Sequence, residues 1–198
     1  APPEVHGYME PGNIIKKDEY YYSMFAALLS PTDPMQRGTC IMRTATLEDP
    51  SSWKVWDGKG FNIPHINPYK NQPSNPNQYI CTPVSQQTIG DLRSSLTHNT
   101  YLQKYMLVGT GVYQHEDNPQ SCGFWFSLSD DLIIWSKPQL LRAAILGWPP
   151  CNQQTASQQQ AKVWQEAYPS LIDHDAPDIS FTQADNTVYL YFMQNKDP

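Results

Sequence analysis

The feature that most constrains the fold is a sequence pattern that returns at a constant interval. Three aromatic and aliphatic runs, YYYSMF, KYMLVG and VYLYFM, begin at positions 20, 104 and 188, so the two intervals between their starts are equal. Downstream of the first two runs, CIMRTATLEDPSSW (40–53) and CGFWFSLSDDLIIW (122–135) share a Cys-x12-Trp spacing. A recurrence of this kind predicts that the chain is built from repeated structural units.

Each full unit is predicted to hold four short β-strands. The first unit contains NIIKK, YYYSMFAALL, TCIMRTATL and WKVWDG, and the second contains SLTHN, KYMLVGTGVY, GFWFSLS and IIWSKPQLL. Short β-branched and aromatic runs, separated by turns of Asp, Asn, Pro, Gly and Ser, are typical of antiparallel strands. We therefore predict an all-β protein in which four-stranded antiparallel blades repeat around an axis as a β-propeller.

The predicted blades occupy about 10–61, 81–141 and 168–198, within a single domain over residues 1–198. The third shows only its first two strands, DISFTQADN and TVYLYFMQN, so about two and a half blades are visible. Propellers close with about 4–8 blades, and proteins normally avoid open sheet edges. We therefore expect this stretch to associate with the rest of a larger chain. An all-β sandwich with two similar halves is the alternative fold.

Two connections interrupt the repeat. FNIPHINPYKNQPSNPNQ (61–78) is rich in Pro and Asn, which predicts a surface loop. Within the Gln-rich connection at 147–167, the segment TASQQQAKVWQEA has a helix-forming composition and predicts a short helix.

Charge and cysteine content narrow the functional classes. The net charge of −6 offers no basic surface for nucleic acid or an anionic membrane, and no apolar run approaches a membrane span. The four cysteines form no CxxC pair and the histidines are scattered, so we expect no zinc site, and the predicted chemistry needs no metal. The cysteines allow alternative disulfide pairings, between which the sequence does not choose. One or two disulfides in a secreted, extracellular protein are preferred, with four reduced thiols in a cytosolic protein as the alternative.

A candidate column of inward-facing groups stands at the same distance before each repeated run, at Glu10, Ser94 and Asp178. The first strand of each propeller blade lines the central channel, so these positions are predicted to face one funnel. Cleavage of a glycosidic bond requires two carboxyl groups at a shared cavity, one protonated as acid and one ionised as base or nucleophile. Glu10 and Asp178 are therefore the catalytic candidates.

The segment EPGNIIKKDEYYYSMF (10–25) resembles five-bladed β-propeller glycoside hydrolases of the family 43 type. In those proteins a Glu before Pro or Gly-Pro opens a blade and a run of the kind kkdGyYYl follows, although Glu19 here replaces the turn glycine. RTATLEDPSSWKVWDGKGF and SLSDDLIIWSKPQLL resemble outer-strand segments of these hydrolases and of sialidase-like propellers, and APDISFTQADNTVYLYF is similar to the start of another blade.

The resemblance implies a role for each carboxylate of the column. It implies that Glu10 is the general acid and that Asp178 aligns with an inward-facing carboxylate. It also implies a general base on an earlier blade, and the segment before Glu10 contains no Asp.

Further side chains are candidates for substrate contact. Arginine offers a rigid fork of donors to sugar hydroxyls or a carboxylate, and the clustered oxygens of LIDHDAPD suit a structural Ca²⁺. The candidates are Arg93, Ser94, His98, Asn99, Tyr168, Asp173 and His174, with Asp175 added for Ca²⁺ and Trp148 and Trp164 as additional aromatic platforms. Each has a plain structural alternative as a turn, strand-entry or packing residue.

Together these patterns predict a secreted carbohydrate-active protein, a glycoside hydrolase that acts on an oligo- or polysaccharide through a carboxylate acid/base pair. Apart from a structural Ca²⁺, no cofactor is expected. Two alternatives stay open, because a fold does not dictate a function. One is a non-catalytic propeller that binds glycan or protein in a surface assembly. The other is a structural β protein that assembles through its open edges.

Overall fold

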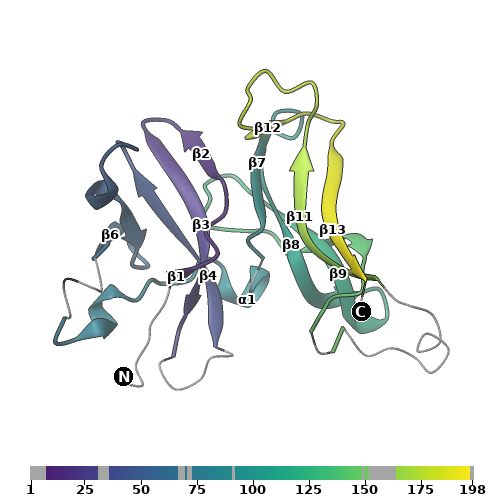
Figure 1. The fold of residues 1–198 in the computed structure, drawn as a ribbon, viewed down its shortest axis with the longest axis horizontal. Helices are drawn as coiled ribbons and strands as arrows, with labels where there is room; N and C mark the ends of the chain where they lie inside the picture. Colours follow the sequence, from purple (N-terminus) through teal and green to yellow (C-terminus); the bar gives the residue numbers. More distant parts are fainter. Residues whose placement is uncertain are drawn as a thin grey trace.

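The computed structural model describes residues 8–30, 36–66, 70, 73–90, 92–148, 150–151 and 164–196. Nearly all of its regular structure is β, which confirms the all-β prediction (Figure 1). The strands form three sheets, and successive sheets follow one another along the chain.

The first sheet is a meander that contains the four strands that the sequence predicts and two more, Tyr8–Met9 and Phe61–Pro64. The second of these begins the segment 61–78, so the predicted surface loop is wrong over its first four residues. The order of the sheet is β1-β3-β4-β5-β6, and β2 pairs with the same edge of β3 as β1 does. The predicted segments NIIKK, YYYSMFAALL, TCIMRTATL and WKVWDG correspond to β2 to β5. The bounds are β1 Tyr8–Met9, β2 Ile14–Lys17, β3 Tyr20–Leu28, β4 Arg37–Thr44, β5 Lys54–Trp56 and β6 Phe61–Pro64.

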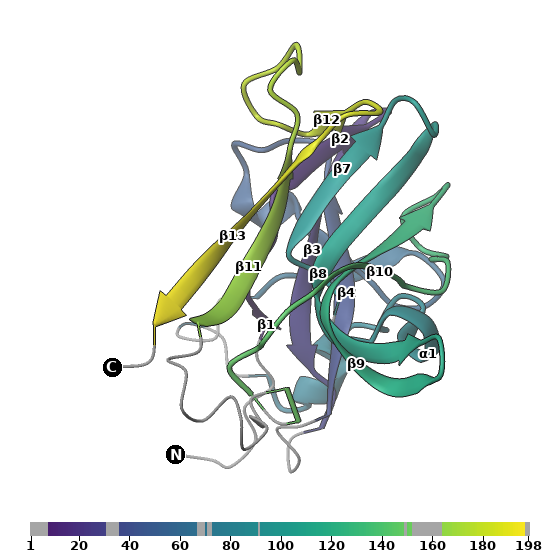
Figure 2. The same cartoon turned by 90° about the vertical axis from the view of Figure 1, so that its right-hand side faces the viewer.

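The second sheet repeats this meander and gains one strand from the third unit. Its order is β10-β9-β8-β7-β12, in which β12 pairs with β7 in parallel and every other pair is antiparallel. The bounds are β7 Ser95–Asn99, β8 Lys104–His115, β9 Asn118–Ser129, β10 Gln139–Ala143 and β12 Gln183–Ala184. The fourth strand therefore begins later than the predicted IIWSKPQLL. Figure 2 shows β8 and β9 bending strongly, so the sheet curls.

The third sheet differs from the prediction. It pairs β11 (Trp164–Ile172) with β13 (Tyr189–Lys196) in antiparallel fashion. The second predicted strand of this unit is confirmed as β13, but the predicted first strand, DISFTQADN, is wrong, because it forms turns and the short β12. Residues 164–167, predicted as the end of a helix, are strand, and residues 152–163 lie outside the described part of the chain. Pairing with β13 overrides the helix-forming composition of this segment.

In the described part of the chain, three short helices connect the strands. The 3-10 helices η1 (Pro50–Ser52) and η2 (Pro76–Tyr79) each begin after a residue whose side chain caps the first turn, Asp49 and Asn75. The helix α1 (Gln86–Ile89) leads into the second sheet. Ile89 is buried in the core between the first and second sheets, which anchors this connection.

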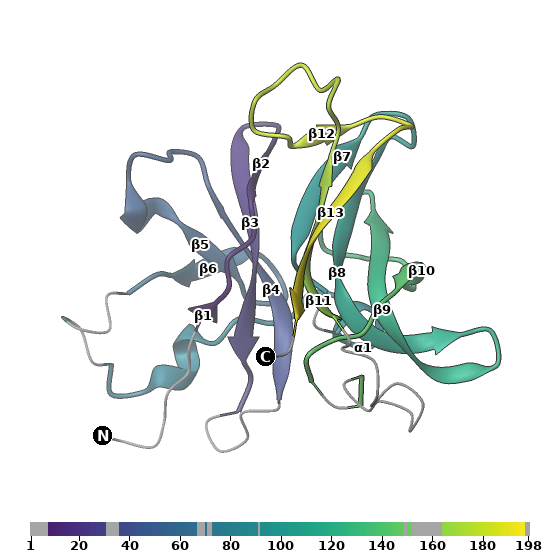
Figure 3. The same cartoon turned by 45° about the vertical axis from the view of Figure 1, so that its right-hand side comes forward.

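Hydrophobic clusters between neighbouring sheets hold the sheets together. Met24 and Ile41 of the first sheet pack in one cluster with Leu107 and Trp125 of the second. A second cluster contains Phe124 of β9 and, packed against it, Leu190 and Phe192 of β13. The second sheet therefore packs against the first through one cluster and against the third through the other. Figure 3 shows the first sheet on the left and the second on the right.

The disulfides follow the repeat. Cys40 on β4 bonds Cys81, and Cys122 on β9 bonds Cys151. Each bond ties the third strand of its sheet to the connection that follows the sheet. The structure thus selects one of the pairings that the sequence left open.

Candidate functional site

In the second unit, the first strand is shifted relative to the second strand from the place where the sequence repeat would put it. The amide of Gly12 donates to Met24 O (2.7 Å) and that of Ser94 donates to Val108 O (2.8 Å). Met24 and Val108 hold the same place in YYYSMF and KYMLVG, the runs that define the repeat. Ser94 is therefore the structural counterpart of Gly12.

This pairing changes the predicted column of Glu10, Ser94 and Asp178. Because Ser94 matches Gly12, the residue that matches Glu10 in the second unit is Leu92, which is fully buried. The predicted column is wrong in this register. The second unit places an apolar core residue where the first unit places a carboxylate.

Tyr168 occupies the position in the third sheet that Glu10 occupies in the first. Ile14 and Met9 pair with Ser23 and Ala26, whereas Leu171 and Ala167 pair with Leu190 and Met193, the same spacing along the second strand. Glu10 directly follows Met9, and Tyr168 directly follows Ala167. Both adopt the left-handed backbone conformation, with φ of 51° and 55°.

A left-handed conformation is unfavourable for side chains of this size, and such strain concentrates at functional sites. In the third sheet Tyr168 stands at a bulge, since the pairing register shifts between Ala167 and Ser170. Bulges re-aim a side chain away from the regular pleat. The fold therefore projects a carboxylate and a phenol ring at equivalent points of two first strands.

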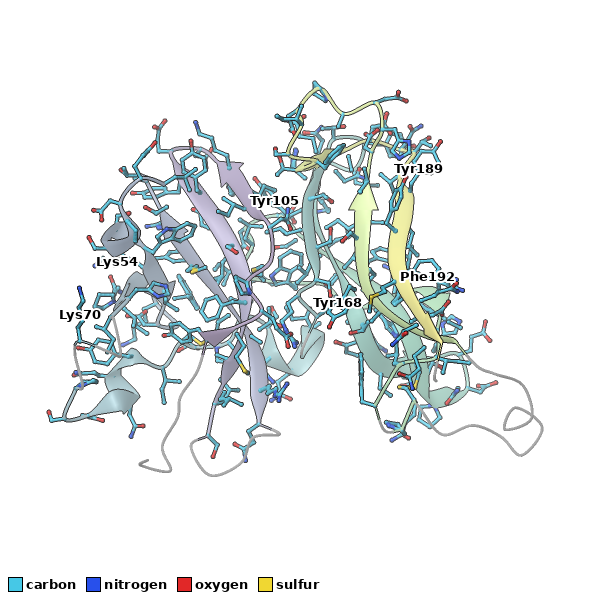
Figure 4. The ribbon with its side chains drawn as sticks, viewed as in Figure 1. Lys54, Lys70, Tyr105, Tyr168, Tyr189 and Phe192 are labelled. Carbon is cyan, nitrogen blue, oxygen red and sulfur yellow. A yellow bond between two sulfur atoms is a disulfide. The ribbon has the colours of Figure 1, made fainter. Side chains whose placement is uncertain are left out.

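Hydrogen bonds show that the first strands of successive units lie side by side. The Asn13 side chain donates to Leu96 O (2.7 Å) and accepts from Leu96 N (2.8 Å). The Ser95 hydroxyl accepts from Leu171 N in the same way one unit later (3.3 Å). Glu10 lies between β1 and β2 of the first unit and Tyr168 lies on β11 of the third, and Figure 4 labels Tyr168 beside β11.

Arg93 crosses from the second unit to hold Glu10. Its Nε and Nη2 donate to the same carboxylate oxygen, Oε2, at 3.1 and 2.6 Å. The Glu10 side chain is 60% exposed whereas that of Arg93 is only 14% exposed, so a largely buried guanidinium holds an exposed carboxylate. Both residues are candidates from the sequence, but no sequence pattern predicts the ion pair between them. The arrangement presents an exposed carboxylate that is held through one of its two oxygens.

Asp178 lies away from Glu10, and its side chain stabilises the turn in which it stands. Its carboxylate accepts hydrogen bonds from the amides and hydroxyls of Ser180 and Thr182. The bond from the Ser180 hydroxyl, the strongest influence, holds the pKa of Asp178 below its ordinary value. Figures 1 and 3 place the segment between β11 and β12 at the top of the molecule, well away from the junction of β1 and β2. Nothing in this geometry joins Asp178 to Glu10.

Three other candidates have structural partners. The Asn99 side chain donates to Asp185 O (2.8 Å) and accepts from Leu102 N (2.7 Å), which fastens the β7–β8 turn to the third unit. The Asp173 carboxylate accepts from the amides of Asp175 and Asp185, both at 2.9 Å. The His98 ring lies against Tyr105.

His174 stacks on Tyr189, with ring centroids 4.2 Å apart, and shares a hydrogen bond with the Tyr191 hydroxyl (2.8 Å). Of the additional aromatic platforms, Trp148 is exposed and the Trp164 side chain lies outside the described part. Within the described residues no group of three or more His, Cys, Asp or Glu side chains is placed to hold a metal ion.

A second ion pair, which the sequence did not suggest, joins the second and third sheets. Both terminal guanidinium nitrogens of Arg142 on β10 donate to Glu166 on β11 at 2.9 Å, and Gln194 donates to the same carboxylate. Burial raises the pKa of Glu166, but the hydrogen bonds from Arg142 and Gln194 outweigh it and leave the pKa below its usual value. Because Glu166 is buried, this pair is structural.

Comparisons with protein-family models, with curated proteins and with solved structures returned no match. None of the helices in the described part of the chain is long and apolar enough to span a bilayer.

Proposed function

We propose that the three sheets are consecutive blades of a five-bladed β-propeller, and that the chain is a secreted glycoside hydrolase acting at Glu10. The observation that carries the proposal is the exposed Glu10 carboxylate, held by Arg93 where two first strands meet. The repeated meander and the adjacent first strands support the propeller. The two disulfides support an extracellular protein.

The site offers two kinds of contact to a sugar. The Glu10 carboxylate and the Arg93 guanidinium can bond hydroxyl groups, and the exposed Tyr168 ring offers an apolar surface at the equivalent point of the third sheet. During hydrolysis Glu10 would hold the proton that the leaving oxygen receives, as the resemblance to family 43 implies.

A second function, glycan binding without hydrolysis, is favoured by the position of Asp178. Its carboxylate is engaged within its own turn, so the second carboxyl group that hydrolysis requires is not Asp178 as it stands here. A site of Glu10, Arg93 and Tyr168 would then bind sugar and leave it intact.

The test is Glu10→Gln, assayed on aryl glycosides with good and poor leaving groups and by calorimetric titration with oligosaccharides. The matched control is Glu19→Gln, the same change at a turn glutamate outside the site. An acid role predicts a loss of about 10²–10⁴-fold on the poor leaving group, a much smaller loss on the good one, and retained binding.

Two other results have clear meanings. If the wild type binds oligosaccharides without hydrolysing them and Glu10→Gln weakens that binding, the chain is a binding module. If Glu10→Gln and Glu19→Gln behave alike in both assays, Glu10 has no part in the function.

A further inference from the structure

Two cationic side chains face each other directly across neighbouring strands of the first sheet. Arg43 on β4 pairs in register with Lys54 on β5, which Figure 4 labels. Residues opposed in this way lie on the same face of the sheet with Cβ atoms about 4.5–5.5 Å apart, and like charges at such positions destabilise the pair. In the described part of the chain neither side chain forms an ion pair with a carboxylate. Although the net charge of the protein is −6, these neighbouring cations therefore have no acidic partner among the described residues.

Aromatic rings hold the guanidinium of Arg43 in a fixed orientation. Its central carbon lies 4.0 Å from the centre of the Tyr20 ring and 4.3 Å from that of Phe61. Stacking covers the flat faces of a guanidinium and leaves the N–H donors at its edge, where their geometry matches a carboxylate. Among the described residues this edge makes one hydrogen bond, from Nη1 to the Tyr22 hydroxyl (3.4 Å). Because that hydroxyl accepts the bond, its own proton is a second donor beside the guanidinium.

The fold does not require a cation at the position of Arg43. Tyr22 and Met106 hold the same place in the runs YYYSMF and KYMLVG. The residues that pair with them on the third strand of each sheet are Arg43 and Leu128. The second unit thus has leucine where the first unit has arginine. Packing alone therefore does not account for Arg43, and its charge is the feature that needs a role.

We propose that Arg43 and Lys54 bind the carboxylate group of an acidic sugar, a uronic acid unit of an oligosaccharide. A carboxylate is planar and accepts two parallel hydrogen bonds from the edge of a guanidinium. Bound between the two cations, it offsets the repulsion between them. The hydroxyl of Tyr22 supplies a further donor to the same group.

Aromatic side chains beside the two cations favour a sugar as the carrier of the carboxylate. Trp56 packs against Phe61, with ring centroids 5.3 Å apart, and both residues are half-buried. Such rings offer an apolar surface to the C–H groups of a sugar ring. The sugar part of this inference rests on the proposed function, whereas the anion part rests on the charges and contacts of Arg43 and Lys54 alone.

The experiment is calorimetric titration of the protein with trigalacturonate and with its methyl ester, which is the same trisaccharide without charge. The wild type is expected to bind the acid at least about tenfold more tightly than the ester. Arg43→Gln and Lys54→Gln should each weaken binding of the acid by about tenfold or more, since each removes a charge-assisted hydrogen bond. The matched control is Lys16→Gln, the same change of charge on the opposite face of this sheet, and it should leave binding unchanged.

Two comparisons separate this test from loss of folding and from the role of Glu10. Arg43→Gln removes a side chain that packs between two rings, so urea unfolding is measured for each variant. Lys54 has no ring contact in the described part of the chain, and Lys54→Gln is expected to unfold like the wild type. Because affinity for acid and ester is compared without hydrolysis, Glu10→Gln should keep the preference for the acid, whatever its effect on catalysis.

Acetate distinguishes an acidic sugar from a free carboxylate. It is expected to bind at least about tenfold more weakly than trigalacturonate, and acetate that binds as tightly would overturn the assignment of a sugar. Equal affinity of the wild type for acid and ester overturns the proposal, as does a wild type that binds neither. So does a preference for the acid that persists unchanged in both Arg43→Gln and Lys54→Gln.

Discussion

At the scale of single residues, the structure separates carboxylates that look alike in the sequence. Glu10 is exposed and held by an arginine, Asp178 caps a turn, and Glu166 is buried in an ion pair. Of these three, Glu10 is the carboxylate that combines an exposed side chain with a cationic partner, so it is the one open to a ligand. The sequence could propose Glu10 from its place ahead of a tyrosine-rich strand. It could not separate Glu10 from Asp178, because the partners of each come from folding.

The ion pair of Arg142 and Glu166 gives a pH prediction. Since the folded pKa of Glu166 is lowered, the pair stabilises the fold above the ordinary glutamate pKa of about 4.3 and the effect disappears as pH falls through the folded value. Glu166→Gln should cost about 2 kcal/mol of unfolding free energy at neutral pH, and this cost should shrink as the pH falls below about 4.3. Urea unfolding measures both.

The exposed Glu48→Gln is the control for this prediction, and it should leave stability nearly unchanged at either pH. A cost for Glu166→Gln that persists unchanged in acid would show that the charge of Glu166 does not stabilise the fold.

At the scale of strands, the sequence predicted the short local hairpins but not the pairing between strands that are far apart in the chain. β2 with β3 and β7 with β8 formed where aromatic and β-branched runs flank a turn. The turn of the first hairpin consists of Asp18 and Glu19, whereas that of the second runs over 100–103. Because the second turn is longer, the first strand of the second unit is shifted along the sequence relative to its second strand. A repeat counted along the sequence does not show this shift.

Asn13 provides the prediction at this scale, because its side-chain amide bonds both the N–H and the C=O of Leu96 on the neighbouring unit. Asn13→Ala should lower the unfolding free energy by about 1–3 kcal/mol, since two hydrogen bonds are lost and backbone groups are left without that partner. Thermal and urea unfolding measure the loss. Asn186→Ala, at an exposed loop asparagine, should cost little, and equal costs for the two would argue against a link between units.

At the scale of the whole molecule, the sheets are held by separate cores and by a disulfide in each of the first two units. The bond Cys40–Cys81 belongs to a cluster within the first unit, and Cys151 belongs to the cluster between the second and third sheets. The bonds join cysteines that are 41 and 29 residues apart in sequence. Cross-links of this span constrain the unfolded chain strongly.

Replacement of either pair by serine, Cys40→Ser with Cys81→Ser or Cys122→Ser with Cys151→Ser, should cost about 2–4 kcal/mol of unfolding free energy. Because the bonds lie in different cores, the two costs should add. Urea unfolding with and without reductant measures them. Wild-type stability that is insensitive to reductant would show that the bonds do not form, and it would favour a cytosolic protein.

The sequence by itself determined the repeat, the all-β class and the second strand of each unit, since hairpins and strand periodicity depend on residues close together in the chain. Only the tertiary structure decided the disulfide pairing, the partner of β13, the parallel pairing of β12 with β7 and the contact of Arg93 with Glu10. Each of these joins residues far apart in sequence. Such contacts depend on which faces and edges remain free after the local strands have packed, and no local pattern records that.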